Sequence, residues 1–202
     1  MTGACAYLLG SIPFGFLIAK VRGVDLREVG SKNIGATNVF RTVGKGAGIA
    51  AFALDAGKGL LAVMWGEHLV PQLFDVDVGL LLQIKVFAGA CAVVGHNWTC
   101  FLGFKGGKGV ATSLGLLFGL VPLGALMALG VWLVVVLATR YVSLGSIIAA
   151  AALGIGVWFV YPGEPVWFLC AVSALALLAI IKHHANIRRL FNGKENRISF
   201  SK

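Results

Sequence analysis

The stretch LGALMALGVWLVVVLAT, from Leu123 to Thr139, contains no charged side chain. A helix rises about 1.5 Å per residue, so a run of this length approaches the roughly 30 Å thickness of the hydrocarbon core of a bilayer. The whole chain has the same character: 58% of its 202 residues are hydrophobic, 12% are charged, and the mean hydropathy is +0.90. Soluble domains carry about 25% charged residues. We therefore expect an all-α, polytopic integral membrane protein.

The same length criterion, applied along the chain, predicts seven transmembrane helices. They are expected near Thr2 to Ala19, Ala47 to Val70, Val78 to Gly95, Val110 to Val121, Leu123 to Thr139, Leu144 to Val160 and Val166 to Ile181. The fourth segment is short, and only Pro122 separates it from the fifth. Residues 1–202 are expected to form a single transmembrane domain, with no soluble domain.

The distribution of Lys and Arg predicts the orientation. Basic residues follow the first, third, fifth and seventh predicted spans, whereas the turns 71–77 and 161–165 contain acidic residues and no Lys or Arg. Positively charged loops stay in the cytoplasm. The N-terminus is therefore expected outside and the C-terminus in the cytoplasm.

The net charge of +9 limits the possible partners. The basic residues flank apolar spans and alternate with glycine, which indicates anionic lipid headgroups and a phosphorylated substrate, not nucleic acid. The four cysteines form no CxxC pair. The cytoplasmic loops contain few carboxylates, namely Asp25, Glu28 and Glu195, although a magnesium site normally uses one or two of them. No metal or other cofactor is predicted.

The first cytoplasmic segment reads GSKNIGATNVFR, from Gly30 to Arg41. It offers neutral hydrogen-bonding side chains, a guanidinium fork suited to phosphate, and glycines that let backbone amides approach a ligand. These side chains are Ser31, Asn33, Thr37, Asn38 and Arg41. The segment is predicted to hold a polar substrate. The alternative is a solvated loop whose polar residues cap helices.

The second segment reads GHNWTCFLGFKGGKG, from Gly95 to Gly109, and lies directly before an apolar helix. The amides of Gly106 and Gly107, the helix dipole and the ammonium groups of Lys105 and Lys108 predict a phosphate site. It is not a nucleotide-binding P-loop, because Leu102 replaces the first glycine of that motif and Gly109 replaces its Ser or Thr. The alternative is a helix start with snorkelling lysines.

The third segment reads KHHANIRRLFNGKE, from Lys182 to Glu195. On a helix, His183 and Asn186 share a face and His184 points elsewhere, so one histidine can join a site. The alternative is a basic tail that holds anionic lipid headgroups. In the second span, Asp55 and Lys58 are spaced i, i+3 and are predicted to form a structural ion pair. Lys85, in the third span, has no partner nearby in the sequence.

Taken together, the three segments carry a family resemblance. On the strings GSKNIGATNVFR, GHNWTCFLGFKGGKG and HHANIRRLFNGKE, in this order, the chain resembles the acyl-phosphate-dependent glycerol-3-phosphate acyltransferases of bacterial inner membranes. The similarity covers essentially the whole chain. It implies transfer of an acyl group from acyl phosphate to the sn-1 hydroxyl of glycerol 3-phosphate, giving lysophosphatidic acid and inorganic phosphate in the first acylation step of phospholipid biosynthesis. The active site would face the cytoplasm.

The resemblance also implies roles for particular residues. The catalytic residues would be Ser31, Arg41, Lys105 and His183, and the substrate-binding residues Asn33, Thr37, Asn38, His96, Gly106, Gly107, Lys108, Asn186 and Glu195. His184 is not carried over, and no histidine begins the His-x-x-x-x-Asp dyad of thioester-dependent acyltransferases. The competing hypothesis is a transporter or channel for phosphate or an organophosphate. The sequence shows no duplicated halves, and its polar groups gather at one membrane face, both of which argue against transport.

Overall fold

The computed structural model describes residues 2–69, 72 and 77–199, and within these ranges every regular element is a helix. Each of the seven predicted apolar segments contains a helix, and Val70, the predicted end of the second segment, lies outside the described residues. The chain divides into two compact units: the first ends at Leu120 and the second begins at Val121. Each unit is described by itself, and the prediction of one domain over residues 1–202 stays a prediction.

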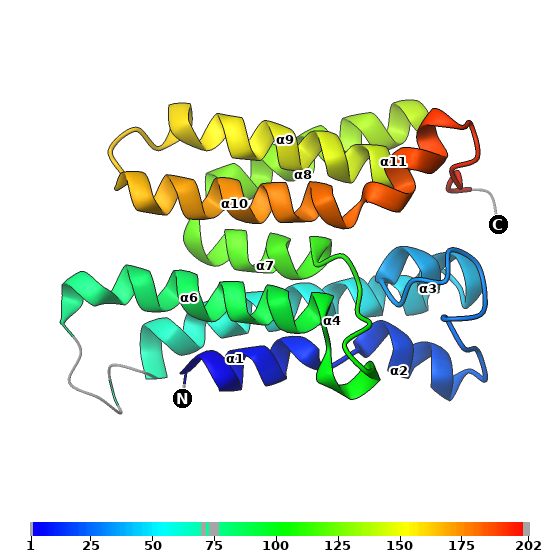
Figure 1. Ribbon diagram of the computed structural model, residues 1–202, viewed down its shortest axis with the longest axis horizontal. Coiled ribbons are helices and arrows are strands. Elements are labelled where there is room, and N and C mark those ends of the chain that lie inside the picture. The colour runs from blue at the N-terminus through cyan, green and yellow to red at the C-terminus, as the bar shows by residue number, and fades with distance from the viewer. Residues whose placement is uncertain (1, 70–71, 73–76, 200–202) are drawn as a thin grey trace. The chain divides into compact units, whose positions relative to one another are not determined.

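The first unit contains the first four apolar segments and the loops between them (Figure 1). Its helices are α1 (Thr2–Ser11), α2 (Phe14–Val21), α3 (Ala36–Thr42), α4 (Lys45–Met64), α6 (Val78–Asn97) and α7 (Val110–Leu120), with a π-helical turn η1 (Trp65–Leu69) and a 3-10 turn η2 (Cys100–Leu102). The first predicted span is therefore broken. Pro13 lacks the N–H that would continue the helix, so α1 ends before it and α2 begins after it.

Glycines set the spacing of the helices in the first unit. A Cβ at Gly10 of α1 would collide with the backbone of Ala92 in α6, and one at Gly115 of α7 would collide with the backbone of Ala56 in α4. Small residues let membrane helices approach until their backbones touch. The helix pairs α1–α6 and α4–α7 are packed in this way, and α1 and α6 run side by side in Figure 1.

The π-helical turn at the end of α4 explains the position of Lys85. Glu67 lies in this turn, and its Oε2 is 3.1 Å from Lys85 Nζ on α6. A π-turn inserts one residue into an α-helix and shifts the facing side chains. Lys85, which has no partner nearby in the sequence, is thus neutralised by Glu67 from the turn after α4.

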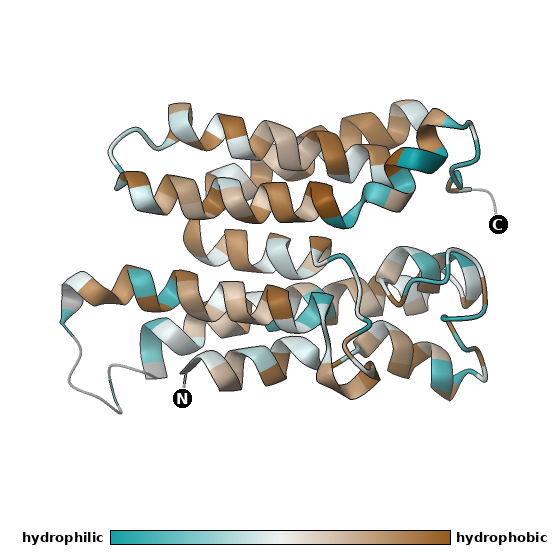
Figure 2. Ribbon diagram, in the orientation of Figure 1, coloured by the Kyte–Doolittle hydropathy of each residue, from teal (hydrophilic) through white to brown (hydrophobic). Residues whose placement is uncertain are grey.

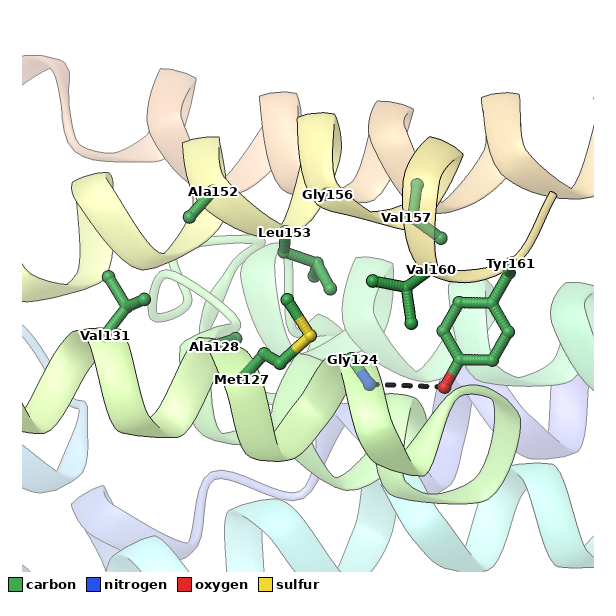
Figure 3. A pocket seen from close by; sticks show the side chains of 10 residues that line it. All are labelled: Gly124, Met127, Ala128, Val131, Ala152, Leu153, Gly156, Val157, Val160 and Tyr161. Atoms are coloured by element: carbon green, nitrogen blue, oxygen red, sulfur yellow. Dashed lines mark hydrogen bonds between the residues drawn. The ribbon is translucent and has the colours of Figure 1, made fainter.

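The second unit is formed by α8 (Pro122–Thr139), α9 (Val142–Val160), α10 (Val166–Lys182) and α11 (His184–Phe191). A small apolar cavity of about 30 Å³ lies between α8 and α9 (Figure 3). The side chain of Met127 from α8 and that of Leu153 from α9 line it, and Tyr161 closes one end by accepting a 3.2 Å hydrogen bond from Gly124 N.

Within the part of the chain that the structure describes, five segments are long and apolar enough to cross a membrane: Gly3–Val21, Lys45–His68, Gly79–Leu102, Pro122–Thr139 and Val142–Val160. A sixth is possible if α10 and α11, which meet at a bend of 54°, count as one span. The predicted fourth span is a helix of 11 residues, which is about 16 Å long and shorter than the hydrocarbon core. The chain is therefore an all-helical, multi-pass membrane protein, and the count of seven crossings stays a prediction. Hydrophilic residues gather at α11 and in the loop before α3 (Figure 2).

Candidate functional site

The loop between α2 and α3 is built around the side chain of Asn38. Its Oδ1 accepts a 3.0 Å hydrogen bond from Ser31 N, and its Nδ2 donates to the carbonyls of Leu26, Val29 and Asn33 at 3.3, 3.1 and 2.9 Å. Asn38 is only 1% exposed. These bonds use all the polar groups of the side chain. The geometry therefore supports loop organisation by Asn38, and its predicted contact with substrate stays a prediction.

Two further residues of this loop have local roles. Asn33 Oδ1 accepts a 2.9 Å hydrogen bond from Gly35 N, which turns the chain into α3. Arg27 hydrogen-bonds the Asp25 carboxylate through its side chain and its backbone, and this lowers the pKa of Asp25 to about 2. The Asp25 carboxylate, in the loop before the first segment, is thus paired with an arginine.

The other predicted residues of the first segment lie in the loop and in α3. Ser31 lies in the loop, Thr37 in the first turn of α3 and Arg41 in its last turn, and each is partly exposed. Hydroxyl groups and a guanidinium thus lie on one short stretch of the chain. The hydrogen bonds of the Asn38 side chain hold the loop before α3 in a defined shape. Their proposed contacts with substrate are predictions.

The glycine-rich loop 103–109 folds back onto the end of α6. Gly107 N donates a 3.0 Å hydrogen bond to His96 O, and Gly103 and Gly109 have φ angles of +61° and +75°. A Cβ at Gly106 would collide with His96 O, and one at Gly107 with His96 Nε2. The glycines are therefore needed for close contact with α6 as well as for backbone freedom. Lys105 is exposed on this loop, and Lys108 is partly exposed.

A buried charged cluster lies beneath this loop. Lys58 Nζ is 2.8 Å from Asp55 Oδ1, so the predicted ion pair is present, and Asp55 Oδ1 is also 3.5 Å from His96 Nδ1. The side chains of Asp55, Lys58 and His96 are 2%, 1% and 6% exposed. Lys58 Nζ also donates a 2.8 Å hydrogen bond to Ile12 O, at the break between α1 and α2. His96 is thus buried within this cluster, and its predicted contact with substrate stays a prediction.

In the second unit, His183 lies at the break between α10 and α11, not on one helix with Asn186, and His184 begins α11. His183 and Asn186 are buried, at 3% and 4% exposure, and His184 is exposed. His183 Nδ1 lies 2.7 Å from Ala179 O. Because a carbonyl oxygen only accepts, Nδ1 carries the hydrogen, and in the neutral ring Nε2 is the acceptor nitrogen. This is the tautomer required of a group that accepts a proton or hydrogen bond at Nε2.

Glu195 ties the C-terminal tail to the helices of the second unit. Its Oε1 accepts hydrogen bonds from Ser143 Oγ at 3.1 Å and Asn186 Nδ2 at 2.8 Å, and its Oε2 accepts one from Arg189 Nε at 2.8 Å. The Glu195 side chain is 6% exposed. The sequence suggested a substrate-binding role, but this geometry supports positioning of Asn186.

Sequence reasoning missed several members of these clusters. Ser143 contacts Glu195, and Arg197 Nε donates a 3.0 Å hydrogen bond to Tyr141 OH. In the first unit, Thr99 Oγ1 donates a 2.6 Å bond to Ser11 O. No local pattern marks these residues, because their partners lie 52, 56 and 88 positions away along the chain.

The two units define a class: a multi-pass helical membrane protein with basic and hydrogen-bonding residues in glycine-containing loops and at helix ends. The glycerol-3-phosphate acyltransferase family model matches residues 1–193. The chain belongs to this family.

Relatives support this assignment along the whole chain. The chain is similar to the glycerol-3-phosphate acyltransferase of Geobacter sulfurreducens, with 48% identity over 96% of this chain and 94% of the relative. It is similar to that of Desulforudis audaxviator, with 46% identity over 98% and 94%. Its fold matches the crystal structure of PlsY (YgiH), an integral membrane glycerol 3-phosphate acyltransferase in its glycerol 3-phosphate form, with 43% identity, a TM-score of 0.85, and coverage of 98% and 94%. A lysophosphatidic acid form of that protein matches with a TM-score of 0.83.

Proposed function

We propose that this chain transfers a fatty acyl group from acyl phosphate to the sn-1 hydroxyl of glycerol 3-phosphate. The products are lysophosphatidic acid and inorganic phosphate. The observation that carries the proposal is whole-length membership of the glycerol-3-phosphate acyltransferase family, together with a solved relative in glycerol 3-phosphate and lysophosphatidic acid forms. No observation of comparable weight favours a transporter.

In the first unit, the proposed task is recognition of phosphate. Arg41 offers a planar fork that can make two parallel hydrogen bonds, and Lys105 and Lys108 add charge on a loop that leads into α7. Ser31 and Thr37 are proposed to hydrogen-bond the polar part of the substrate. Together these groups hold an anionic substrate and neutralise the charge that develops on the leaving phosphate.

In the second unit, His183 is proposed to hydrogen-bond a substrate through Nε2, with Asn186 beside it on α11. Transfer is direct: the sn-1 oxygen attacks the acyl carbonyl carbon, and the bond from that carbon to the phosphate oxygen breaks. The hydroxyl proton goes to His183 Nε2 or to a phosphate oxygen. Acyl phosphate is already activated, so the protein needs mainly to position the reactants and stabilise charge.

The proposed location is the bacterial inner membrane, with seven crossings, the N-terminus outside and the active site facing the cytoplasm. For all loop Lys and Arg residues to lie on one side, α7 must cross despite its length. Its close backbone contact with α4 through Gly115 shields it from lipid, and local thinning of the bilayer accommodates a short helix.

Cysteine accessibility tests this topology. Asp77 and Glu164 are replaced by Cys one at a time in a cysteine-free chain and labelled with an impermeant maleimide in intact cells. Both should react from outside, whereas Cys at Lys194 should react only after the membrane is opened. Labelling of Asp77→Cys or Glu164→Cys only in opened cells would refute the orientation.

The activity itself is tested with purified chain in lipid vesicles, palmitoyl phosphate and labelled glycerol 3-phosphate. Lysophosphatidic acid and inorganic phosphate should form in equal amounts without any thioester donor. Arg41→Ala serves as the inactive control. Product formation only with palmitoyl coenzyme A, or none with either donor, would overturn the proposal.

A further inference from the structure

A chain of buried contacts connects the break between α1 and α2 to the glycine-rich loop. From Ile12 O the contacts pass to Lys58 Nζ at 2.8 Å, then to Asp55 Oδ1 at 2.8 Å, and then to His96 Nδ1 at 3.5 Å. The far edge of the His96 ring, at Nε2, lies against Gly107 so closely that a Cβ there would collide with it. All these residues belong to the first unit.

The groups in this chain of contacts are placed where charge is costly. Asp55 lies ten positions after Lys45, the first residue of α4, which is about 15 Å along the helix axis. A simple ion pair between Asp55 and Lys58 would neutralise the two charges without involving any other residue. Here the same carboxylate oxygen also faces a histidine on another helix. The ion pair alone does not account for that contact.

His96 holds the loop from two sides. Its carbonyl accepts the 3.0 Å hydrogen bond from Gly107 N, and its ring forms the surface on which Gly107 rests. The orientation of an imidazole ring is set by the partner of its other nitrogen. His96 Nδ1 faces Asp55 Oδ1 at 3.5 Å, and Asp55 in turn is paired with Lys58.

We propose that Asp55, Lys58 and His96 form a positioning cluster that holds the loop 103–109 in the shape required to bind phosphate. His96 acts on substrate through the loop, and Asp55 acts through His96. The kinetic consequence rests on the proposed function, since it assumes that Lys105 and Lys108 bind a substrate phosphate. The structural consequence, a loosened loop, does not.

Two double variants separate positioning from charge neutralisation. Asp55→Leu with Lys58→Met removes both charges and the oxygen that faces His96 Nδ1. Asp55→Asn with Lys58→Met also removes both charges but retains a side-chain oxygen facing His96. Replacing both members of a buried pair by neutral residues is often tolerated by the fold. If the pair only neutralises charge, the two double variants should behave alike.

The first measurement is the rate of trypsin cleavage after Lys105 and Lys108 in the purified full-length chain. The Leu–Met variant should be cleaved about tenfold or more faster than wild type, because a loop that loses a contact of about 1–3 kcal/mol opens more often. The Asn–Met variant should recover most of the protection. The matched control is Glu67→Gln with Lys85→Met, which neutralises the other intramembrane pair and should leave cleavage unchanged.

The second measurement separates KM from kcat. In the Leu–Met variant the KM for glycerol 3-phosphate should rise about tenfold and kcat should change less, and the Asn–Met variant should restore KM. His96→Phe keeps the ion pair and a ring of similar size but lacks both nitrogens. It should show fast cleavage and raised KM, even if the Leu–Met chain does not fold.

Three results would overturn the proposal: equal cleavage rates in the two double variants, wild-type protection in His96→Phe, or faster cleavage in the Glu67–Lys85 control. If wild type showed no acyltransferase activity, the proposed function would fail while the cleavage results still decided the role of the cluster.

Discussion

Replacing Glu195 by Ala should release the C-terminal tail of the second unit. The change removes acceptors from three donors: Ser143 Oγ, Asn186 Nδ2 and Arg189 Nε. Ser143 and Asn186 are 6% and 4% exposed, so water cannot readily replace what they lose. Hydrogen bonds to a charged group contribute about 1.5–3 kcal/mol each.

The Arg189 bond contributes less than the other two. The Arg189 side chain is 34% exposed, and a solvent-exposed ion pair stabilises the folded state by about 1 kcal/mol or less. The tail should therefore lose about 3–6 kcal/mol relative to an opened state. Glu195→Gln keeps an oxygen for Ser143 and Asn186 and loses mainly the ion pair, so it should cost about 1 kcal/mol.

Hydrogen exchange of residues 182–199 measures this opening directly. A loss of 3 kcal/mol corresponds to exchange that is at least about hundredfold faster, whereas Glu195→Gln should stay within about tenfold. Lys194→Gln, an exposed position in the same tail, is the matched control. Activity should fall with Glu195→Ala, because Asn186 loses its orientation. If Glu195→Ala exchanged as slowly as the control, the positioning role of Glu195 would be wrong.

Other predictions concern binding, packing and mechanism. Arg41→Lys should reduce kcat/KM about tenfold or more because the bidentate fork is lost. Lys105→Ala and Lys108→Ala should each raise KM for the phosphate-bearing substrate. Wild-type kinetics in all three variants would refute the assignment of these residues to phosphate binding. Gly156→Ala should raise the free energy of unfolding more than Gly130→Ala. Both substitutions gain helix propensity, but only Gly156→Ala fills the cavity of about 30 Å³, which should add about 0.7 kcal/mol to the free energy of unfolding. Equal increases in the thermal unfolding temperature would argue against that cavity. Activity should persist in excess chelator, and mass spectrometry after incubation with acyl phosphate alone should find no acylated protein; a kinetically competent ester would refute direct transfer.

Local patterns in the sequence predict much of the helical structure. A run such as 123–139 has to be helical in lipid, because only a helix satisfies its backbone groups within one segment. The spacing of Asp55 and Lys58 predicts their ion pair, and the spacing of His183 and Asn186 predicts that these two are grouped apart from His184. Both are buried and His184 is exposed, although His183 lies at the break before α11. These inferences succeed because the interacting residues lie within one helical turn of each other.

The sequence by itself therefore determined the class of protein, its apolar helices, the family and the three segments proposed to carry the chemistry. Only the tertiary structure decided which polar side chains in those segments face inward. Asn38 satisfies three carbonyls of its own loop, Glu195 binds Ser143 across 52 positions, and His96 meets Asp55 on another helix. Hydrogen bonds between distant residues depend on how helices pack, and no local composition or spacing encodes that packing.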